Sequence, residues 1–327
     1  SGVTEEQRQR LIARHGWFAR VAFTFGRPDT DPERAGLLAG GGALIGGILL
    51  VVGAGLVAVM GGLGCSIAMV VLIATGKIRR RFVAPAPGGS FGWEMLAAFL
   101  AAFLAFRIAA TLLGVIVAGK ESLPPWFAYV SMGGQWIVAL AIFFPLLRGV
   151  GFGEYRKLVG WTAERGVFRE IGAGIFGYLA GLPIVFGGVM LTLLFSFLVN
   201  FWSGKGAEPP ENPILEIAGR GDWILLVLLF TLATIWAPVV EETVFRGGVY
   251  RAMRARMGFF LAAVASALIF GFMHGYQVQL LGPVISLGLV FALMREWRGS
   301  IVGPMVAHFL NNATILGILF LILNAAA

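Results

Sequence analysis

The chain has 327 residues, of which 58% are hydrophobic and only 13% are charged, and its mean hydropathy is +0.86. Because water-soluble domains typically carry about 25% charged residues, this composition excludes a soluble enzyme and predicts a polytopic all-α membrane protein. The formal net charge of +8 is typical of basic loops that face anionic lipid, so we expect the lipid bilayer as a partner and no nucleic acid. The single cysteine, Cys65, excludes an internal disulfide.

Apolar runs predict about nine transmembrane helices, with eight as the alternative, since each span needs about 20 predominantly apolar residues. The segment 35–76 carries no charge and is long enough for a hairpin of two spans. Its turn is predicted either near Gly53–Gly55 or near Gly61–Gly64. The remaining spans are predicted at 94–118, 127–147, 171–200, 223–245, 258–274, 279–294 and 300–324.

These spans divide the chain into three regions. They are an N-terminal segment at 1–34, a membrane region of about five spans at 35–222 and a second membrane domain at 223–324. Residues near 153–171 combine aromatic and charged side chains, which predicts an amphipathic helix in the headgroup layer. Residues 201–222 contain more acidic than basic side chains and are predicted to form an external loop.

The distribution of basic residues predicts the orientation in the membrane. Arg and Lys gather in the N-terminal segment and in the connections 77–81, 148–169, 251–256 and 295–298. With nine spans these are alternate connections, so the positive-inside rule predicts a cytoplasmic N-terminus and a C-terminus outside. This parity requires 35–76 to cross the membrane twice. We expect an integral protein of a bacterial inner membrane.

Two adjacent carboxylates end the span at 223–245. Glu242 and Arg246 are four residues apart and share one helix face, so they can pair, whereas Glu241 points about 100° away and stays available. Pro238 cannot donate a hydrogen bond to the carbonyl of Thr234, so we expect a kinked or loosened helix one turn before the carboxylates. Taken alone, such a glutamate pair is more often a solvated helix end.

Three further polar residues lie in the spans that follow. His274 ends one span, and His308 and Asn312 project from the same face of the last one. Such residues are costly in hydrocarbon unless they meet around water, and ionisable residues within the membrane usually mark function. Arg107 lies in the middle of the span 94–118, and the sequence does not identify a partner for it.

This set of side chains suits peptide hydrolysis. A carboxylate and an imidazole can activate water, and a second imidazole with an amide can stabilise the oxyanion that forms. No Ser or Cys nucleophile elbow accompanies them. Glu241, His274 and His308 could instead hold Zn²⁺, so zinc is possible although no cofactor is required. An ion- or proton-coupled transporter and a catalytically silent scaffold are the alternatives.

At these residues the chain resembles the CPBP family of intramembrane proteases, which includes type II CAAX prenyl endopeptidases and Abi-like bacteriocin-processing relatives. The matching motifs are Glu241-Glu242-x-x-x-Arg246, Phe270-x-x-x-His274 and His308-x-x-x-Asn312, and the resemblance covers about 223–324.

The resemblance implies that Glu241 and His274 position and activate the water and that His308 and Asn312 form the oxyanion site. Glu242 and Arg246 would support them. It permits a metallo- or a metal-free glutamate mechanism, of which we favour the second. It implies a membrane-associated protein or peptide substrate without fixing its class, and we expect a conical cavity open to the cytoplasm with the cluster at its base.

Overall fold

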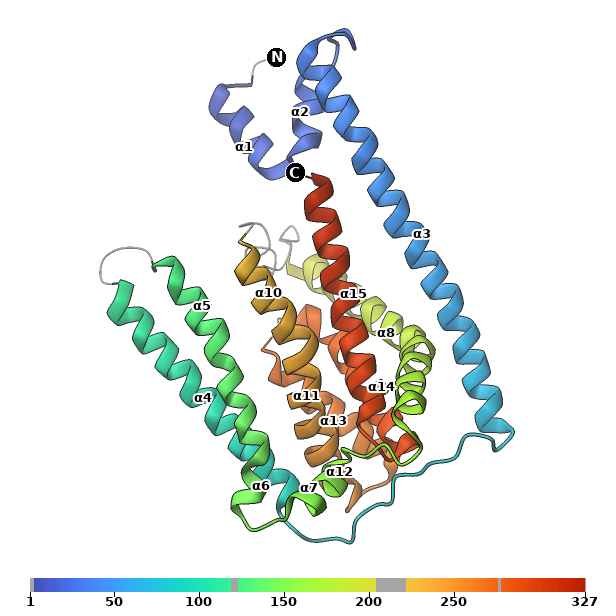
Figure 1. The fold of residues 1–327 in the computed structure, drawn as a ribbon. Coiled ribbons are helices and arrows are strands. Elements are labelled where there is room, and N and C mark those ends of the chain that lie inside the picture. The colour runs from blue at the N-terminus through green and yellow to red at the C-terminus, as the bar shows by residue number, and fades with distance from the viewer. Residues whose placement is uncertain (1–2, 119–122, 204–221, 276–277, 327) are drawn as a thin grey trace. The chain divides into compact units, whose positions relative to one another are not determined.

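The computed structural model describes residues 3–118, 123–203, 222–275 and 278–326. The chain divides into two compact units (Figure 1): one contains 1–58 and 315–327, and the other contains 59–314. The described residues form helices and connections and contain no strand, which confirms the all-α prediction. Every candidate site residue belongs to the second unit.

The first unit is built around the N-terminal helices. It contains α1 (Glu5–His15), α2 (Trp17–Phe23), the beginning of α3 (Pro32–Ala74) and the end of α15 (Val302–Ala326). The indole N–H of Trp17 donates a hydrogen bond of 2.7 Å to the carbonyl of Leu37. The same ring lies against Gly41, where a Cβ atom would come within 2.4 Å of it. Helix α2 therefore packs on the first turns of α3.

The prediction of a hairpin within 35–76 is wrong, because α3 is one continuous helix of 43 residues. The segment contains no proline, asparagine or aspartate, and glycines alone do not end a helix that is satisfied by its own backbone hydrogen bonds. At 1.5 Å per residue α3 is about 64 Å long, twice the hydrocarbon thickness of a bilayer. The double crossing that supported a cytoplasmic N-terminus is therefore absent.

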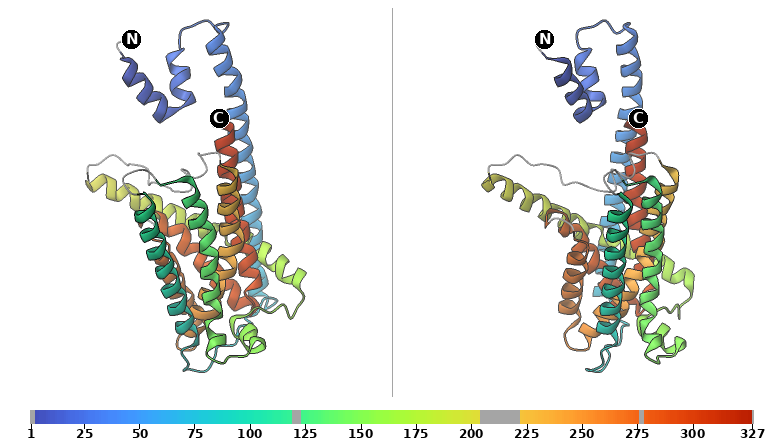
Figure 2. Two further views of the ribbon diagram at one scale, coloured as in Figure 1. Left: turned by 60° about the vertical axis from the view of Figure 1, so that its left-hand side comes forward. Right: turned by 90° about the vertical axis from the view of Figure 1, so that its left-hand side faces the viewer.

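The second unit contains the remaining helices. Their bounds are α4 (Phe91–Ala118), α5 (Pro125–Gly134), the 3₁₀ helix η1 (Gln135–Phe143), α6 (Phe144–Leu147), α7 (Phe152–Val159), α8 (Val167–Ser203), α10 (Trp223–Thr231), the π-helices η2 (Leu232–Trp236) and η3 (Thr243–Val249), α11 (Ala237–Glu242), α12 (Tyr250–Arg254), α13 (Phe259–Met273), α14 (Val278–Arg298) and the first part of α15. Helix α14 packs against both α8 and α13, and α4 lies beside the α5–η1 segment (Figure 2).

Six helical stretches in the described residues are long and apolar enough to cross a membrane. They are Pro32–Ala74, Phe91–Ala118, Pro125–Leu147, Val167–Trp202, Trp223–Arg254 and Val302–Leu321. The predicted spans at 258–274 and 279–294 are present as α13 and α14, but neither is among these six. A polytopic membrane protein is confirmed, whereas the count of nine spans is not.

The predicted interfacial helix is shorter than expected. Helix α7 ends at Val159, because Gly160 takes a left-handed conformation with φ of 89°. The apolar face of α7 packs on protein: Tyr155 and Val159 are fully buried, and the Tyr155 hydroxyl donates a 3.0 Å hydrogen bond to the carbonyl of Ile142. The amphipathic pattern thus reflects packing against neighbouring helices. The predicted external loop at 201–222 lies mostly outside the described residues.

The four basic connections of the second unit lie at the same end of it. The backbone N–H of Arg81 donates to the carbonyl of Glu296 at 2.9 Å. The Glu296 carboxylate accepts two hydrogen bonds of 3.0 Å from Arg254. The Ser300 hydroxyl donates to the carbonyl of Thr162 at 2.6 Å. These contacts join 77–81, 148–169, 251–256 and 295–298, so the charge pattern and the packing define one basic end.

Glycine sets the distance between α4 and the helix that carries the candidate site. A Cβ atom on Gly92 would lie 2.3 Å from the carbonyl oxygen of Gly248, which is a backbone atom that cannot move aside locally. We expect Gly92→Ala to lower stability by about 1–3 kcal/mol through this overpacking. The measurement is the thermal unfolding midpoint of the purified protein in detergent.

The matched control is Gly133→Ala in α5, where a Cβ atom would meet nothing within 4 Å. That change should be neutral or stabilising, because alanine is the better helix former by about 1 kcal/mol. Equal midpoints for the two variants would contradict the close approach of α4 to η3.

Candidate active site

The first motif lies in a continuous helix from Trp223 to Arg254 whose hydrogen-bond register changes around Pro238. The N–H of Ala237 donates to the carbonyl of Leu232, five residues earlier, as expected in a π-helix. In that register the carbonyl of Ala233 would need an N–H from residue 238, and proline has none. The predicted loosening before the carboxylates is therefore confirmed, and it leaves one backbone acceptor without a helical donor.

Asn312 supplies the missing donor. Its Nδ2 atom lies 2.7 Å from the Ala233 carbonyl oxygen, and its Oδ1 atom accepts a 3.1 Å hydrogen bond from Asn311. An unsatisfied buried carbonyl is costly, so this contact joins α15 to the irregular turn before the carboxylates. The sequence analysis missed this role, because it depends on a register change that no local pattern reports.

The position of Glu241 along its helix explains how its side chain can lie near that of His274. The predicted span ended at residue 245, but the helix continues to Arg254, which places Glu241 about 20 Å from that end. His274 follows α13 and lies about 22 Å from the first residue of that helix, Phe259. The two side chains thus reach similar heights above the basic end, and Glu241 lies well inside its helix instead of near a membrane face.

Glu242 and Arg246 form the predicted pair and are both fully buried. Arg246 Nη1 lies 3.2 Å from Glu242 Oε1, and its Nη2 donates to the carbonyl of Gly288 at 2.9 Å. The guanidinium carbon also lies 4.4 Å from the centroid of the Phe270 ring and 5.2 Å from that of Phe291. Opposite charge, a carbonyl and aromatic faces together compensate part of the cost of burying this arginine, whose Nε atom has no hydrogen-bond partner among the described residues.

Glu242 also orients the second histidine. Glu242 Oε1 lies 3.0 Å from His308 Nδ1, and the His308 ring stacks on Phe291 with centroids 5.2 Å apart. A carboxylate only accepts, so Nδ1 carries the proton of this hydrogen bond. His308 is buried, and its other nitrogen, Nε2, points to Glu241. Phe291 is a residue of this cluster that the sequence analysis did not identify, since an aromatic residue in an apolar helix gives no local signal.

Two imidazole nitrogens lie near one carboxylate oxygen between these helices. Glu241 Oε2 lies 3.9 Å from His274 Nε2 and 4.0 Å from His308 Nε2. His274 Nδ1 lies 2.8 Å from the carbonyl of Phe270, which fixes its proton on Nδ1 and leaves Nε2 as an acceptor when the ring is neutral. Separations near 4 Å are too long for direct hydrogen bonds, but each of them suits a water that lies about 2.8 Å from both atoms of the pair.

The structure therefore brings together five of the six predicted site residues. Glu241, Glu242, Arg246, His274 and His308 form one connected cluster, whereas Asn312 contacts the same helix about two turns before Glu241, at Ala233. Arg107 is exposed on α4 and forms no ion pair with the described residues, so it stays outside this cluster.

The residues of the cluster do not fit a zinc site in their present positions. Two ligands on one tetrahedral zinc lie about 3.3 Å apart, since each Zn–N or Zn–O bond is about 2.0–2.1 Å. Both separations from Glu241 Oε2 exceed this. Among the described residues no group of three His, Cys, Asp or Glu is arranged to hold a metal. The positions of these side chains therefore support no reaction step that uses a metal bound by the cluster.

Access to the cluster is partial. The side chain of Glu241 is 17% exposed and that of His274 is 23% exposed, while His308 is covered. A cavity of about 910 Å³ lies elsewhere, on the opposite side of α14, and none of the six site residues lines it. The expected conical cavity above the cluster thus stays a prediction.

Comparison with known proteins identifies relatives of the part that carries this cluster. Residues 223–314 match the family model of the type II CAAX prenyl endopeptidase Rce1-like domain. The chain is 24% identical over 157 residues to the membrane-embedded CAAX protease MroQ of Staphylococcus aureus, an alignment that covers 45% of this chain and 60% of that protein.

A second relative matches over more of its length. The "Uncharacterized 24.3 kDa protein" of Escherichia coli is 31% identical over 172 residues, which cover 51% of this chain and 72% of that protein. No solved structure matches this chain.

Proposed function

This chain belongs to the CPBP family of intramembrane proteases, and we propose that it hydrolyses a peptide bond of a membrane-associated protein or peptide with a water activated by Glu241 and His274. The family supports a membrane endopeptidase in general. The observation that carries the finer proposal is that Glu241 Oε2 lies 3.9 Å from His274 Nε2 and 4.0 Å from His308 Nε2. Glu241 Oε2 and the Nε2 atom of a neutral His274 both accept hydrogen bonds, so the gap between them favours a molecule that donates two hydrogens, as water does.

In the proposed reaction Glu241 removes a proton from this water, and the resulting hydroxide adds to the scissile carbonyl carbon. A protonated His308 donates from Nε2 to the oxyanion, and its positive charge is balanced by Glu242 at Nδ1. Collapse of the intermediate breaks the C–N bond, and the proton held by Glu241 passes to the leaving amine.

Asn312 is proposed to assist the oxyanion with its remaining amide hydrogen. We expect Asn312→Ala to lower stability by about 1–3 kcal/mol, because the Ala233 carbonyl loses its donor. The rate constant kcat should fall by about 10²-fold or more if the amide also contacts the oxyanion. Unfolding midpoints and kcat at a temperature well below them separate the two effects.

Asn311→Ala is the matched control for this variant. It removes the donor to Asn312 Oδ1 but leaves the contact with Ala233 in place. An unchanged midpoint for Asn312→Ala would deny the structural role, and an unchanged kcat would remove Asn312 from the oxyanion site.

We favour a metal-free mechanism in which no cofactor is required. Its support is the pair of distances from Glu241 Oε2, which suit a water better than a shared zinc ion. Elemental analysis of protein purified without chelator is expected to give zinc far below one equivalent. Stoichiometric zinc that is lost in His274→Ala would overturn this preference and favour a metallopeptidase that binds through Glu241, His274 and His308.

We also propose that the basic end of the second unit faces the cytoplasm of a bacterial inner membrane. The support is the positive-inside rule applied to its four basic connections, which are joined by contacts such as that of Arg81 with Glu296. With one crossing by α15, the C-terminus then lies outside. A cysteine introduced near Lys77 should react with a membrane-impermeant reagent that is applied from the cytoplasmic side. It should not react when the reagent is applied from the outside.

The experiment that tests the function compares membrane peptides from cells that express the wild-type chain and from cells that express Glu241→Gln. A peptide that is cut only in cells with the wild-type chain identifies the substrate, and its two fragments identify the scissile bond. Identical peptide profiles together with wild-type function of the variant in the cell would favour a silent scaffold. Proton flux into proteoliposomes that depends on a transported solute would favour a transporter.

A further inference from the structure

The cavity of about 910 Å³ combines an apolar wall with a basic opening. Its wall is formed by Met69 and Ile73 of α3, by Gly177, Ala180 and Gly181 of α8, and by Leu293 of α14, and Arg79 and Arg80 lie at its polar end. The volume is at the upper end of the range of about 300–1,000 Å³ found for small-molecule sites. All these residues belong to the second unit.

Small residues of α8 line the cavity and let α14 approach closely, since a Cβ atom would come within 2.7 Å of Met294 at Gly177 and within 2.6 Å of Val290 at Gly181. Gly177, Ala180 and Gly181 follow a spacing of three and four residues and therefore share one helix face. Ser66 Oγ donates to the carbonyl of Ala180 at 2.8 Å, which holds α3 close to this face. The apolar part of the cavity thus forms a channel between α3, α8 and α14.

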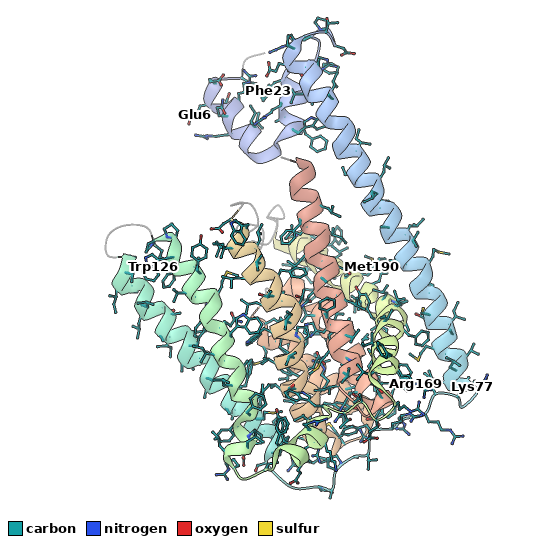
Figure 3. The ribbon with its side chains drawn as sticks, viewed as in Figure 1. Glu6, Phe23, Lys77, Trp126, Arg169 and Met190 are labelled. Carbon is teal, nitrogen blue, oxygen red and sulfur yellow. The ribbon has the colours of Figure 1, made fainter. Side chains whose placement is uncertain are left out.

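Positive charge exceeds negative charge at the opening of the cavity. Glu296 is the acidic residue of the lining, and Arg254 and the Tyr250 hydroxyl already occupy its carboxylate at 2.7–3.0 Å. Arg79 and Arg80 form no ion pair with any residue of the described ranges. The guanidinium of Arg80 lies 4.6 Å from the Phe259 ring centroid, so two positive charges remain for a ligand. Lys77, labelled in Figure 3, precedes them in the chain.

The cavity is also separate from the candidate active site. Val290, Leu293, Met294 and Trp297 of α14 line it, whereas Gly288 on a different face of the same helix accepts from Arg246. Trp297, at the polar end, is the type of residue that lies at the level of lipid headgroups. Arginines above an apolar channel at this level match a phosphodiester above an acyl chain.

We propose that this cavity binds one anionic phospholipid, with an acyl chain against α3, α8 and α14 and the phosphate at Arg79 and Arg80. The proposal does not depend on the catalytic residues, so it can fail or hold independently of the peptidase function. A lipid in this place would join α3 to the helices that carry the site.

The test is native mass spectrometry of the full-length, delipidated protein titrated with phosphatidylglycerol or with phosphatidylcholine that has the same acyl chains. We expect one phosphatidylglycerol to bind with a preference of about tenfold or more over phosphatidylcholine. Arg79→Gln with Arg80→Gln should abolish that preference. The matched control, Arg156→Gln with Lys157→Gln, makes the same charge change on exposed residues of α7 and should keep it.

A second variant tests the channel. Ala180→Phe fills it and should remove the tightly bound lipid of either type, whereas Ala105→Phe on the exposed face of α4 should not. Glycerol phosphate, which has no acyl chain, should not compete. Equal binding of the two lipids by the wild type, an unchanged preference in the arginine variant, or competition by glycerol phosphate would overturn the proposal.

Discussion

Glu241→Gln is expected to lower the rate of peptide cleavage by about 10²–10⁴-fold, the range for loss of a general base. Glutamine has nearly the shape of glutamate, but its amide cannot accept the proton of the water. Glu241 Oε2 has no hydrogen bond within the described residues and its side chain is 17% exposed, so removal of its charge should leave the fold intact. The loss should therefore appear in kcat while the unfolding midpoint stays near that of the wild type.

The measurement is kcat on the substrate found by peptide comparison, with detergent-purified protein shown to be monodisperse. Glu154→Gln, the same change at an exposed position of α7, is the control and should cleave at the wild-type rate. Turnover by Glu241→Gln within a few-fold of the wild type would end the assignment of Glu241 as the base. His274→Ala should show a similar loss, because His274 holds the other side of the same water.

The helices and the cluster could be predicted because their signals are strong and local. Apolar runs bounded by charge located α4, α8 and α15 to within a few residues. The four-residue spacing of Glu242 and Arg246 predicted their contact, since side chains at i and i+4 meet on any α-helix. The cost of ionisable groups in hydrocarbon then predicted that helices distant in sequence would bring them together.

Other features could not be predicted because they depend on tertiary structure. A charge-free, glycine-rich segment is compatible with one long helix or with two short ones, and α3 is one helix that packs on α8 through Gly62 and Ser66. The contact of Asn312 with Ala233 arises from a register change in another helix. The burial of Arg246 and His308 also depends on residues distant in sequence, since Phe291 contacts both side chains.

Arg246→Met should destabilise the protein by about 3–5 kcal/mol, because it leaves the carboxylate of Glu242 buried without its cation. Both side chains of this pair are 0% exposed. The stability gained from the apolar side chain of methionine is smaller than the cost of the buried, unpaired carboxylate, because the desolvation of that charge is not compensated. The control is Arg10→Met in α1, which breaks an ion pair of the same four-residue spacing at an exposed site and should leave the unfolding midpoint unchanged.

The double variant Glu242→Gln with Arg246→Met distinguishes stability from chemistry. Removing both charges restores a neutral buried site, so the double variant should recover most of the stability lost in Arg246→Met. It should still cleave slowly, because His308 Nδ1 then faces an amide that cannot balance a positive imidazole during oxyanion formation. Denaturant titration and kcat of the four proteins complete the cycle. Recovery of both stability and cleavage in the double variant would contradict a role for Glu242 in the charge balance of His308.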